Sequence, residues 1–392
     1  MAPIALAFAV LDLGSKSDLG FVLAAGWAPQ IVFILVGGVW ADRLPRNVVM
    51  VVTNVLSGVA QGAIACLLLL DRAEVWHLVA LQVFRGIATS FFFPASFSVV
   101  PQTVPSAQLQ QANALMRLSQ NTTSILGSVV AGALVATIGS GWAIAFDAAT
   151  YFASAAILSR MRIRGPIAAA AAANFLRELA EGWREFASRT WLWTVVVAAS
   201  VGNLVWVGGQ AVLGPVVAKE SLSGAAGWGG VAAGEGAGLL VGSIVALRWR
   251  PARPLFTGVL LLSGTSVFLA SLALPASLPM VILAGAIAGF GLETFNVNWT
   301  TTMHEQIPDD ALARVSSYDA LGSFVFIPLG LTIAGPAADA IGVSGALWTA
   351  AGASGLAMLG ALLSRDVRRL QRRAATPSSP APTGEPIPPP IR

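Results

Sequence analysis

Long apolar stretches, separated by short polar segments, constrain this chain more than any other feature. A helix needs about 20 mostly apolar residues to cross the hydrocarbon core of a membrane. The sequence contains eleven such stretches, at residues 19–41, 47–70, 76–99, 111–138, 142–161, 191–217, 225–247, 254–274, 279–302, 313–338 and 344–364. Charged residues make up only 11% of the chain, whereas a soluble domain has about 25%. The sequence therefore predicts an all-α membrane protein.

A twelfth apolar segment, from Ala2 to Leu13, opens the sequence but is too short to cross a membrane. No Lys or Arg precedes it, which makes it a poor signal peptide. We therefore expect a twelve-helix plan with a truncated first helix. A genuine truncation and a misassigned start codon are both open explanations.

The positions of the basic residues predict how the helices are oriented. If the loop between the second and third helices is cytoplasmic, 18 of the 23 Lys and Arg residues fall on the cytoplasmic side. Only Lys16, Arg72 and Lys219 fall on the opposite side. Cytoplasmic loops of membrane proteins carry an excess of Lys and Arg. We therefore expect a multi-pass protein of the plasma membrane with a cytoplasmic C-terminus, and the basic charge indicates topology rather than nucleic-acid binding.

The two halves of the chain repeat each other at an offset of 203 residues. The offset aligns the Val-Pro pair at 104–105 with the Ile-Pro pair at 307–308, Leu109 with Leu312, Gly127 with Gly330, Gly132 with Gly335, and Gly139 with Gly342. Parallel repeats of this kind place the substrate path of a transporter between the halves, near the middle of the membrane.

The repeat predicts a division of the chain into parts. We expect an N-terminal helix bundle over residues 1–162, with a partial first helix, and a C-terminal helix bundle over residues 191–366. The linker at 163–190 carries an amphipathic segment from Asn174 to Ser188, which either lies at the cytoplasmic membrane interface or packs on the bundle. The tail at 367–392 is rich in Pro, Ser, Thr and Ala, and we expect it to be disordered.

The loop between the second and third apolar stretches carries a recognisable motif. It reads GVWADRLPRN from Gly38 to Asn47 and resembles the signature loop of the major facilitator superfamily, whose members are secondary transporters with two pseudo-repeated six-helix bundles. The residues that match are Gly38, Ala41, Asp42, Arg43 and Arg46, whereas Pro45 and Asn47 depart from the signature. The resemblance implies the major facilitator fold.

The same resemblance implies a gate. The acid at Asp42 would face the start of the eleventh helix, where a helix carries about half a positive charge. Arg314 follows shortly after the start of that helix. We expect Asp42, Arg43, Arg46 and Arg314, with Gly38, to form a cytoplasmic latch.

Further segments resemble one branch of that family, which contains the enterobactin exporter and macrolide-efflux relatives. The segments lie at 93–95, 109–114, 146–148, 314–319 and 328–330. Small residues at Gly127, Ser128, Ala131 and Gly132 resemble, in degenerate form, a motif of proton-coupled antiporters. Together they favour export, but the branch moves diverse compounds and does not select one.

Ionisable residues inside the apolar stretches are candidates for proton coupling. A charged side chain at the centre of a bilayer costs at least about 2.5–3.5 kcal/mol, so such residues are functional candidates by default. Glu235 and Glu293 lie in the middle of their stretches, and Arg85 lies within the fourth helix of the plan. We expect Glu235 or Glu293 to carry the proton, with Arg85 as a modulator. Asp147 and Asp319 lie nearer to helix ends, and we expect them to brace or cap helices.

Polar and aromatic residues within the apolar stretches are candidates for substrate contact. Asn203, Trp206 and Gln210 recur along one face of one helix, and Asn296 and Trp299 follow Glu293 in another. Such groups in an apolar cavity suit amphipathic organic compounds. They serve equally well as hydrogen-bond partners between helices.

Several classes of protein are disfavoured by what the sequence lacks. It has no glycine-rich phosphate loop of an ATP-driven pump, one cysteine, and two histidines, neither in a metal-ligand spacing. We expect no enzyme, no cofactor and no metal.

The leading interpretation is a secondary transporter that exports small amphipathic compounds, drug-like or siderophore-like, in exchange for protons. We expect its partners to be a small-molecule substrate, protons and the lipid bilayer, without nucleic acid, and we expect a monomer. A non-transporting membrane scaffold or sensor and an importer of the same fold are the alternatives.

Overall fold

The structure is a computed structural model that describes residues 2–41, 46–103, 109–161, 182–274 and 276–372. For parts of several helices, only the path of the backbone is described. Nearly all of the described residues are helical, and they contain no strand. This confirms the predicted all-α fold.

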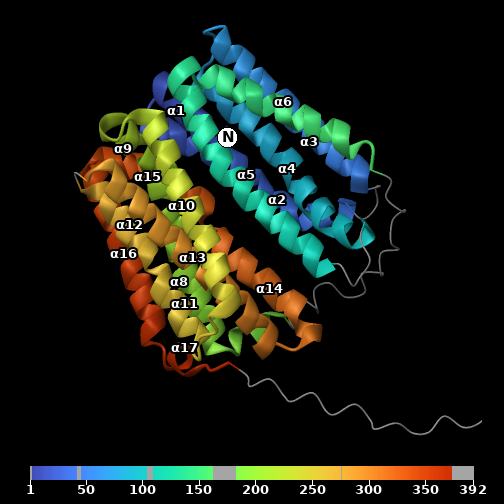
Figure 1. The fold of residues 1–392 in the computed structure, drawn as a ribbon, viewed down its shortest axis with the longest axis vertical. Helices are drawn as coiled ribbons and strands as arrows, with labels where there is room; N and C mark the ends of the chain where they lie inside the picture. The colour runs from blue at the N-terminus through green and yellow to red at the C-terminus, as the bar shows by residue number, and fades with distance from the viewer. Residues whose placement is uncertain (1, 42–45, 104–108, 162–181, 275, 373–392) are drawn as a thin grey trace, which may run out of the picture.

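The N-terminal part contains six helices, seen in blue to green in Figure 1. They are α1 (Ala2–Leu13), α2 (Lys16–Ala41), α3 (Arg46–Leu69), α4 (Val75–Thr103), α5 (Leu109–Ile138) and α6 (Ser140–Leu158). Ser15 and Asp18 form a reciprocal cap at the start of α2, because Ser15 N donates to Asp18 Oδ2 at 2.8 Å and Asp18 N donates to Ser15 Oγ at 3.2 Å. α1 has 12 residues, and most of its side chains are buried.

The C-terminal part contains the helices from residue 190 onward, and some of its apolar stretches are divided into two or three consecutive helices. They are α8 (Thr190–Val207), the π-helix η2 (Gly208–Leu213), α9 (Gly214–Ser221), α10 (Gly224–Arg248), α11 (Pro254–Leu262), α12 (Gly264–Ala273), α13 (Leu278–Gln306), α14 (Asp309–Phe324), α15 (Ile327–Ile341), α16 (Val343–Leu363) and α17 (Arg365–Arg369). Pro328 in the first turn of α15 lacks an N–H group, which fits the break that separates α15 from α14. Each of the eleven apolar stretches thus corresponds to one helix or to consecutive helices of the described chain.

The helices have the length and composition of membrane spans. Nine helical segments are long and apolar enough to cross a membrane within the part of the chain that the structure describes, and α1 and the part of α5 at Thr122–Ile138 are shorter apolar segments. Large apolar side chains such as Leu283 and Leu356 are exposed on the outside of the bundle. Such a surface fits lipid rather than water.

The repeat of 203 residues is visible in the backbone. Gly139 precedes α6 with φ of 89° and ψ of 164°, and Gly342 precedes α16 with φ of 78° and ψ of 157°. A positive φ of this size suits glycine, which has no Cβ. The two halves therefore make the same turn at matching positions.

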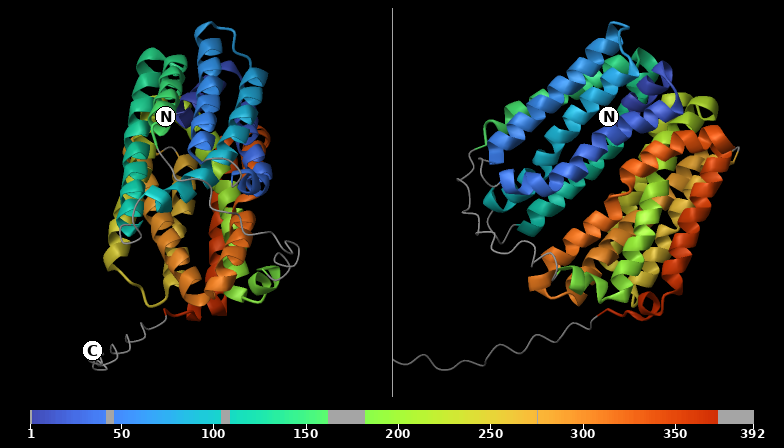
Figure 2. Two further views of the ribbon diagram at one scale, coloured as in Figure 1. Left: turned by 90° about the vertical axis from the view of Figure 1, so that its right-hand side faces the viewer. Right: turned by 180° about the vertical axis from the view of Figure 1, so that it is seen from behind.

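The two groups of helices meet at one end of the molecule and diverge toward the other (Figure 2). They meet where the end of α1 lies beside α9, at the ion pair of Asp12 and Lys219, and we call this the closed end. They diverge toward the end where α6 finishes, α11 begins and α17 lies, and we call this the arginine-rich end after Arg160, Arg253 and the arginines of α17, which belong to these segments or adjoin them in the chain.

The packing between the halves is close enough to require glycine. A Cβ added to Gly335 of α15 would lie 2.4 Å from Ser17 Cα of α2, and one added to Gly132 of α5 would lie 2.7 Å from Ala225 O of α10. Small residues allow helices in membranes to approach this closely. Gly132 and Gly335 are a matching pair of the repeat, so the halves meet through equivalent helices.

The described end of the linker, residues 182–187, is helical and packs on the C-terminal helices. Phe186 is buried, and its ring lies 6.0 Å from the ring of Tyr318 in α14. Trp183 stacks on Phe186 with ring centroids 5.7 Å apart but is 55% exposed. This segment therefore packs on the bundle and also presents an aromatic surface. Of the tail predicted to be disordered at 367–392, residues 367–369 belong to α17 and Val367 is buried, whereas residues from 373 onward lie outside the described part of the chain.

Candidate binding pocket

A pocket of about 340 Å³ lies among the C-terminal helices. Its walls come from α8, α11, α12, α13, α14 and α16, so every lining residue belongs to the second half of the chain, whereas the repeat predicted a substrate path between the halves. The lining is Val195, Val196, Ala199, Gly202, Asn203, Trp206, Leu262, Thr265, Leu292, Phe295, Asn296, Trp299, Asp319, Ala320, Ser323, Phe324 and Met358. Most of these side chains are apolar or aromatic. The pocket is at the small end of the range for ligand sites, about 300–1,000 Å³.

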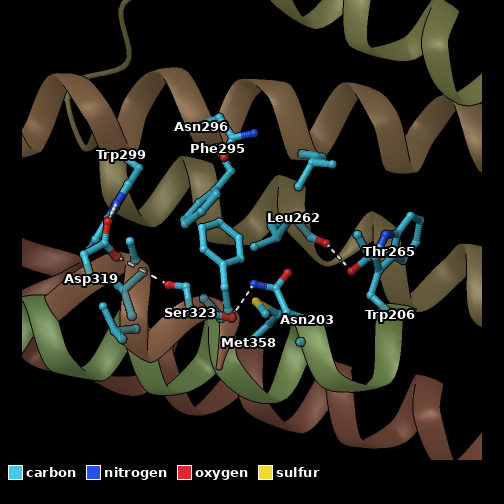
Figure 3. A pocket seen from close by; sticks show the side chains of 17 residues that line it. Asn203, Trp206, Leu262, Thr265, Phe295, Asn296, Trp299, Asp319, Ser323 and Met358 are labelled. Atoms are coloured by element: carbon cyan, nitrogen blue, oxygen red, sulfur yellow. Dashed lines mark hydrogen bonds between the residues drawn. The ribbon is translucent and has the colours of Figure 1, made fainter. Parts of the chain in front are cut away.

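The acid Asp319 marks one end of the pocket (Figure 3). Trp299 Nε1 donates to Asp319 Oδ2 at 3.0 Å, and Ser323 Oγ donates to Asp319 Oδ1 at 3.4 Å. The first of these bonds joins α13 to α14, because the indole and the carboxylate come from different helices. The carboxylate is therefore held in place by the walls of the pocket.

Aromatic rings form much of the remaining wall. Phe295 stacks on Trp299 with ring centroids 6.0 Å apart and planes at 17°. Trp206 lies at the opposite end of the pocket from Asp319 (Figure 3), with its ring 5.3 Å from Phe268 of α12. The pocket thus has a polar end at Asp319 and an aromatic end at Trp206.

Asn203 lies between these ends, on α8. Its Nδ2 donates to the backbone oxygen of Ser323 at 2.9 Å, which ties α8 to α14. Ser200 strengthens the same contact, because its Oγ donates to Gly322 O at 2.6 Å. Asn203 therefore acts as an interhelical partner and as part of the pocket wall.

Four of the five residues expected to contact substrate line this pocket: Asn203, Trp206, Asn296 and Trp299. The fifth, Gln210, is not among the lining residues and lies in η2, where its Nε2 donates to Glu235 Oε2 at 3.3 Å. A π-helix makes wider turns than an α-helix. Residues 203, 206 and 210 would share a face of a regular helix, but the π-helix that begins at Gly208 changes that register.

Asp319 was expected to brace a helix, and the structure places it in the pocket wall as well. Phe295, Thr265 and Met358 are further lining residues that the sequence did not single out. Apolar residues in a pocket wall follow the same pattern as residues in a helix interface. Only the polar and aromatic members of the wall carry a signal in the sequence.

The two candidate glutamates lie at the interface between α10 and α13. A Cβ added to Gly289 of α13 would lie 2.1 Å from Glu235 O, and one added to Gly242 of α10 would lie 3.0 Å from Glu293 Cβ. Glu293 Oε1 accepts a hydrogen bond of 2.8 Å from Ser243 Oγ. Since Gly242 is seven residues from Glu235, the two glutamates are about 10 Å apart along α10 at about 1.5 Å per residue. Neither glutamate lines the pocket.

Arg85 lies in the other half of the protein, at the contact between α4 and α2. Its Nε donates to Gln82 Oε1 at 2.7 Å, and a Cβ added to Gly26 of α2 would lie 3.7 Å from its Nη2. Among the hydrogen bonds and ion pairs of the described residues, none joins Arg85 to Glu235 or Glu293. The structure therefore does not bring the expected proton site and its modulator together.

The expected latch falls mostly outside the structural description. Asp42 and Arg43 lie outside the described residues. Gly38, Arg46 and Arg314 belong to α2, α3 and α14, but only their backbone is described. The latch stays a prediction from the sequence.

Ion pairs join the halves at the closed end. Lys16 Nζ lies 3.0 Å from Asp339 Oδ1, and Ser17 Oγ donates to Asp339 Oδ2 at 3.0 Å. Lys219 Nζ lies 2.5 Å from Asp12 Oδ1 and also donates to Leu11 O at 2.8 Å.

The described residues contain no group of three or more His, Cys, Asp or Glu side chains that could hold a metal ion.

The sequence is similar to a known protein family and to several efflux proteins. Residues 1–320 match the family model of the Major Facilitator Superfamily. The chain is 26% identical over 344 residues to multidrug efflux pump Tap from Mycolicibacterium fortuitum, with 84% of this chain and 83% of that protein covered. It is 23% identical over 337 residues to macrolide efflux protein A from Streptococcus pyogenes, with the same coverage of 84% and 83%.

A solved structure has a similar fold. A bacterial homolog of the human lysosomal transporter Spinster, in an inward-facing and unoccupied conformation, superimposes with a TM-score of 0.73 at 15% identity. The likeness covers 96% of this chain and 94% of that chain. At this identity it supports the fold.

Proposed function

Because this chain belongs to the Major Facilitator Superfamily, and is a membrane transporter rather than an enzyme, we propose that it exports small amphipathic organic compounds in exchange for protons. The observation that carries this proposal is the pocket with an aromatic end at Trp206 and a polar end at Asp319. A mostly apolar site with a few fixed polar groups suits compounds that have both characters. The relatives named as multidrug and macrolide efflux pumps favour export.

Alternating access would move the two halves against each other. We propose that the bundles expected at 1–162 and 191–366 are the moving bodies. In this conformation they are packed together at the closed end and diverge at the arginine-rich end (Figure 2). The opposite conformation requires the contacts of Lys16, Lys219 and Gly335 to separate, while the expected latch at Asp42 and Arg314 closes the other end.

The arginine-rich end is proposed to be cytoplasmic. Arg160, Arg248, Arg253 and Arg365 are exposed there, and an excess of Arg and Lys is typical of cytoplasmic loops. In this orientation the helices of the two halves diverge on the cytoplasmic side, the side from which an exporter is loaded. The same orientation places the C-terminus in the cytoplasm. We further propose that the protein works as a monomer.

Proton coupling is proposed to depend on Glu235 or Glu293. Both lie in the interior of membrane helices, and each accepts a hydrogen bond from a neutral side chain. A carboxyl group in such a site can take up and release a proton without breaking an ion pair. Gln210 lies in η2, which continues α8, the helix that carries Asn203 and Trp206. Its hydrogen bond to Glu235 therefore connects a proposed proton site to a helix of the pocket wall.

The proposal is tested by measuring the accumulation of fluorescent amphipathic compounds in cells that lack other efflux pumps. Expression of the chain should lower accumulation of at least one compound. Trp206→Ala should weaken that effect, whereas Trp76→Ala, which alters an exposed residue outside the pocket, should not. Raised accumulation would indicate import. Unchanged accumulation of every compound would favour a non-transporting scaffold or sensor.

A further inference from the structure

Among its described lining residues, the pocket contains one charged side chain. Asp319 is an acid, and the other sixteen lining residues are apolar, aromatic or neutral polar. Its two hydrogen-bond donors, Trp299 and Ser323, are neutral groups. Among the ion pairs of the described side chains, none includes Asp319. Within the side chains that the structure describes, the pocket therefore presents an acceptor of positive charge that no cation of the protein balances.

A carboxylate in such a wall is costly unless it is paired. Burial of an ionised group requires compensating hydrogen bonds or an opposite charge. Trp299 and Ser323 supply part of the compensation, since each donates one hydrogen bond. An ionised carboxylate accepts about four hydrogen bonds in total. The two bonds leave part of this capacity unused in a residue that lines the pocket.

The neighbouring rings favour the same kind of ligand. Phe295 and Trp299 stack on each other in the wall of the pocket, and Trp299 is bonded to the carboxylate. The face of an aromatic ring attracts a cation that lies within about 6 Å of its centroid. Carboxylate and aromatic rings together form a site for an ammonium or phosphonium group. An anionic ligand would be repelled by Asp319.

We propose that Asp319 is the residue that selects positively charged compounds, by pairing with the cationic group of a ligand that occupies this pocket. This inference rests on the proposed export function and assigns the substrate class of the same site. The ligand is an organic monocation with an apolar, ring-bearing body. Its charged group lies at the Asp319 end, and its rings extend toward Trp206 (Figure 3).

Trp299 is a positioning residue in this site. Its N–H holds Asp319 Oδ2 at 3.0 Å, and its ring forms part of the wall. Trp299→Phe would remove the N–H group and keep most of the ring and the negative charge of Asp319. This variant should weaken binding of a cation by less than Asp319→Asn and should leave the preference for a cation in place.

The test uses two probes of nearly equal shape that differ in charge. Methyltriphenylphosphonium is a permanent cation, and triphenylphosphine oxide is neutral. Binding of each is measured to the purified full-length protein in lipid nanodiscs. The wild type should bind the cation about tenfold or more tightly than the neutral probe. Asp319→Asn should lose about tenfold in affinity for the cation and change little toward the neutral probe, and Asp319→Glu should keep the preference.

Equal affinity of the wild type for the two probes would overturn the inference, as would a preference that Asp319→Asn retains. If Asp319→Asn does not fold, chemical labelling of the wild-type protein still tests the inference. A carbodiimide modifies accessible carboxyl groups, and labelling of Asp319 is read by mass spectrometry of its peptide. Methyltriphenylphosphonium should protect Asp319 from labelling, and triphenylphosphine oxide should not. Unchanged labelling with the cation bound would contradict the proposal.

The outcomes also separate this inference from the proposed function. A wild-type protein that exports neutral compounds but shows no preference for the cation keeps export and loses the role of Asp319. A protein that binds the cation through Asp319 but moves no compound across a membrane keeps the site and loses export.

Discussion

Lys16 Nζ lies 3.0 Å from Asp339 Oδ1, so an ion pair connects the first residue of α2 to α15 across the two halves of the protein. The carboxylate of Asp339 also accepts a hydrogen bond from Ser17 Oγ. Glycine brings the backbones together directly beside this pair, at Gly335 and Ser17. The closed end therefore combines close backbone packing with opposite charges.

The first prediction concerns this ion pair. Lys16→Gln should shift the population away from the conformation that is sealed at the closed end, because the pair exists only while the halves are in contact. The pair is partly exposed, with side-chain exposures of 25% and 55%, and such pairs contribute little. The shift should therefore be small, about two- to fivefold.

The shift is measured by cysteine labelling. In a Cys66→Ser background, Leu331→Cys places a thiol where α15 packs on Gly20 of α2. A maleimide that does not cross membranes, added from the closed side, should label this thiol faster in Lys16→Gln. The exchanged pair Lys16→Asp with Asp339→Lys should restore slow labelling. An unchanged rate in Lys16→Gln would show that the pair does not hold the halves together.

The second prediction concerns the close approach at Gly335. Gly335→Ala should lower the melting temperature of the purified protein and reduce transport, because the new Cβ would lie 2.4 Å from Ser17 Cα. Gly352→Ala in α16 is the matched control, since a Cβ there meets nothing within 4 Å. In a helix interior, alanine is favoured over glycine by about 0.5–1 kcal/mol, so the control should be neutral or slightly stabilised. Equal melting temperatures for the two variants would contradict this account of the contact.

The third prediction concerns the proton site. Glu235→Gln or Glu293→Gln should remove the dependence of transport on pH, because glutamine cannot release a proton at this position. Glutamine preserves the size of the side chain, so insertion into the membrane should be unaffected. Glu220→Gln, at an exposed position near the end of α9, is the control. Full pH-dependent transport by both interior variants would place the proton site elsewhere.

The fourth prediction concerns the latch. Asp42→Asn should reduce transport about tenfold or more while leaving expression and insertion intact, because the amide cannot balance the positive end of a helix. Asp71→Asn is a suitable comparison, since Asp71 lies in the short connection between α3 and α4. Transport by Asp42→Asn at the wild-type rate would remove the latch from the mechanism.

Helix positions could be predicted from the sequence because the membrane imposes one simple requirement. A spanning helix must satisfy its backbone internally and present apolar side chains, and that requirement is visible in the apolar stretches. One of the five matches that reveal the repeat, Gly139 with Gly342, has a local cause, because both positions need a positive φ. Such local requirements depend on few residues.

The pocket could be predicted only in part. Asn203, Trp206, Asn296 and Trp299 were identifiable because they are polar or aromatic residues within apolar stretches. The π-helix that separates Gln210 from them leaves no clear pattern in the sequence. The bond from Trp299 to Asp319 joins residues 20 positions apart on two helices, and the pair of Lys16 and Asp339 spans 323 positions. Contacts of this kind depend on how helices pack, which periodicity does not reveal.

The most direct test of the central claim is uptake of fluorescent amphipathic compounds into inverted membrane vesicles that contain the protein. A proton gradient is imposed, and accumulation is measured with and without an uncoupler. Proton-coupled export predicts that at least one compound accumulates in the energised vesicles and that the uncoupler abolishes this accumulation. Accumulation that persists with the uncoupler would contradict coupling to protons, and no accumulation of any compound in energised vesicles would contradict export.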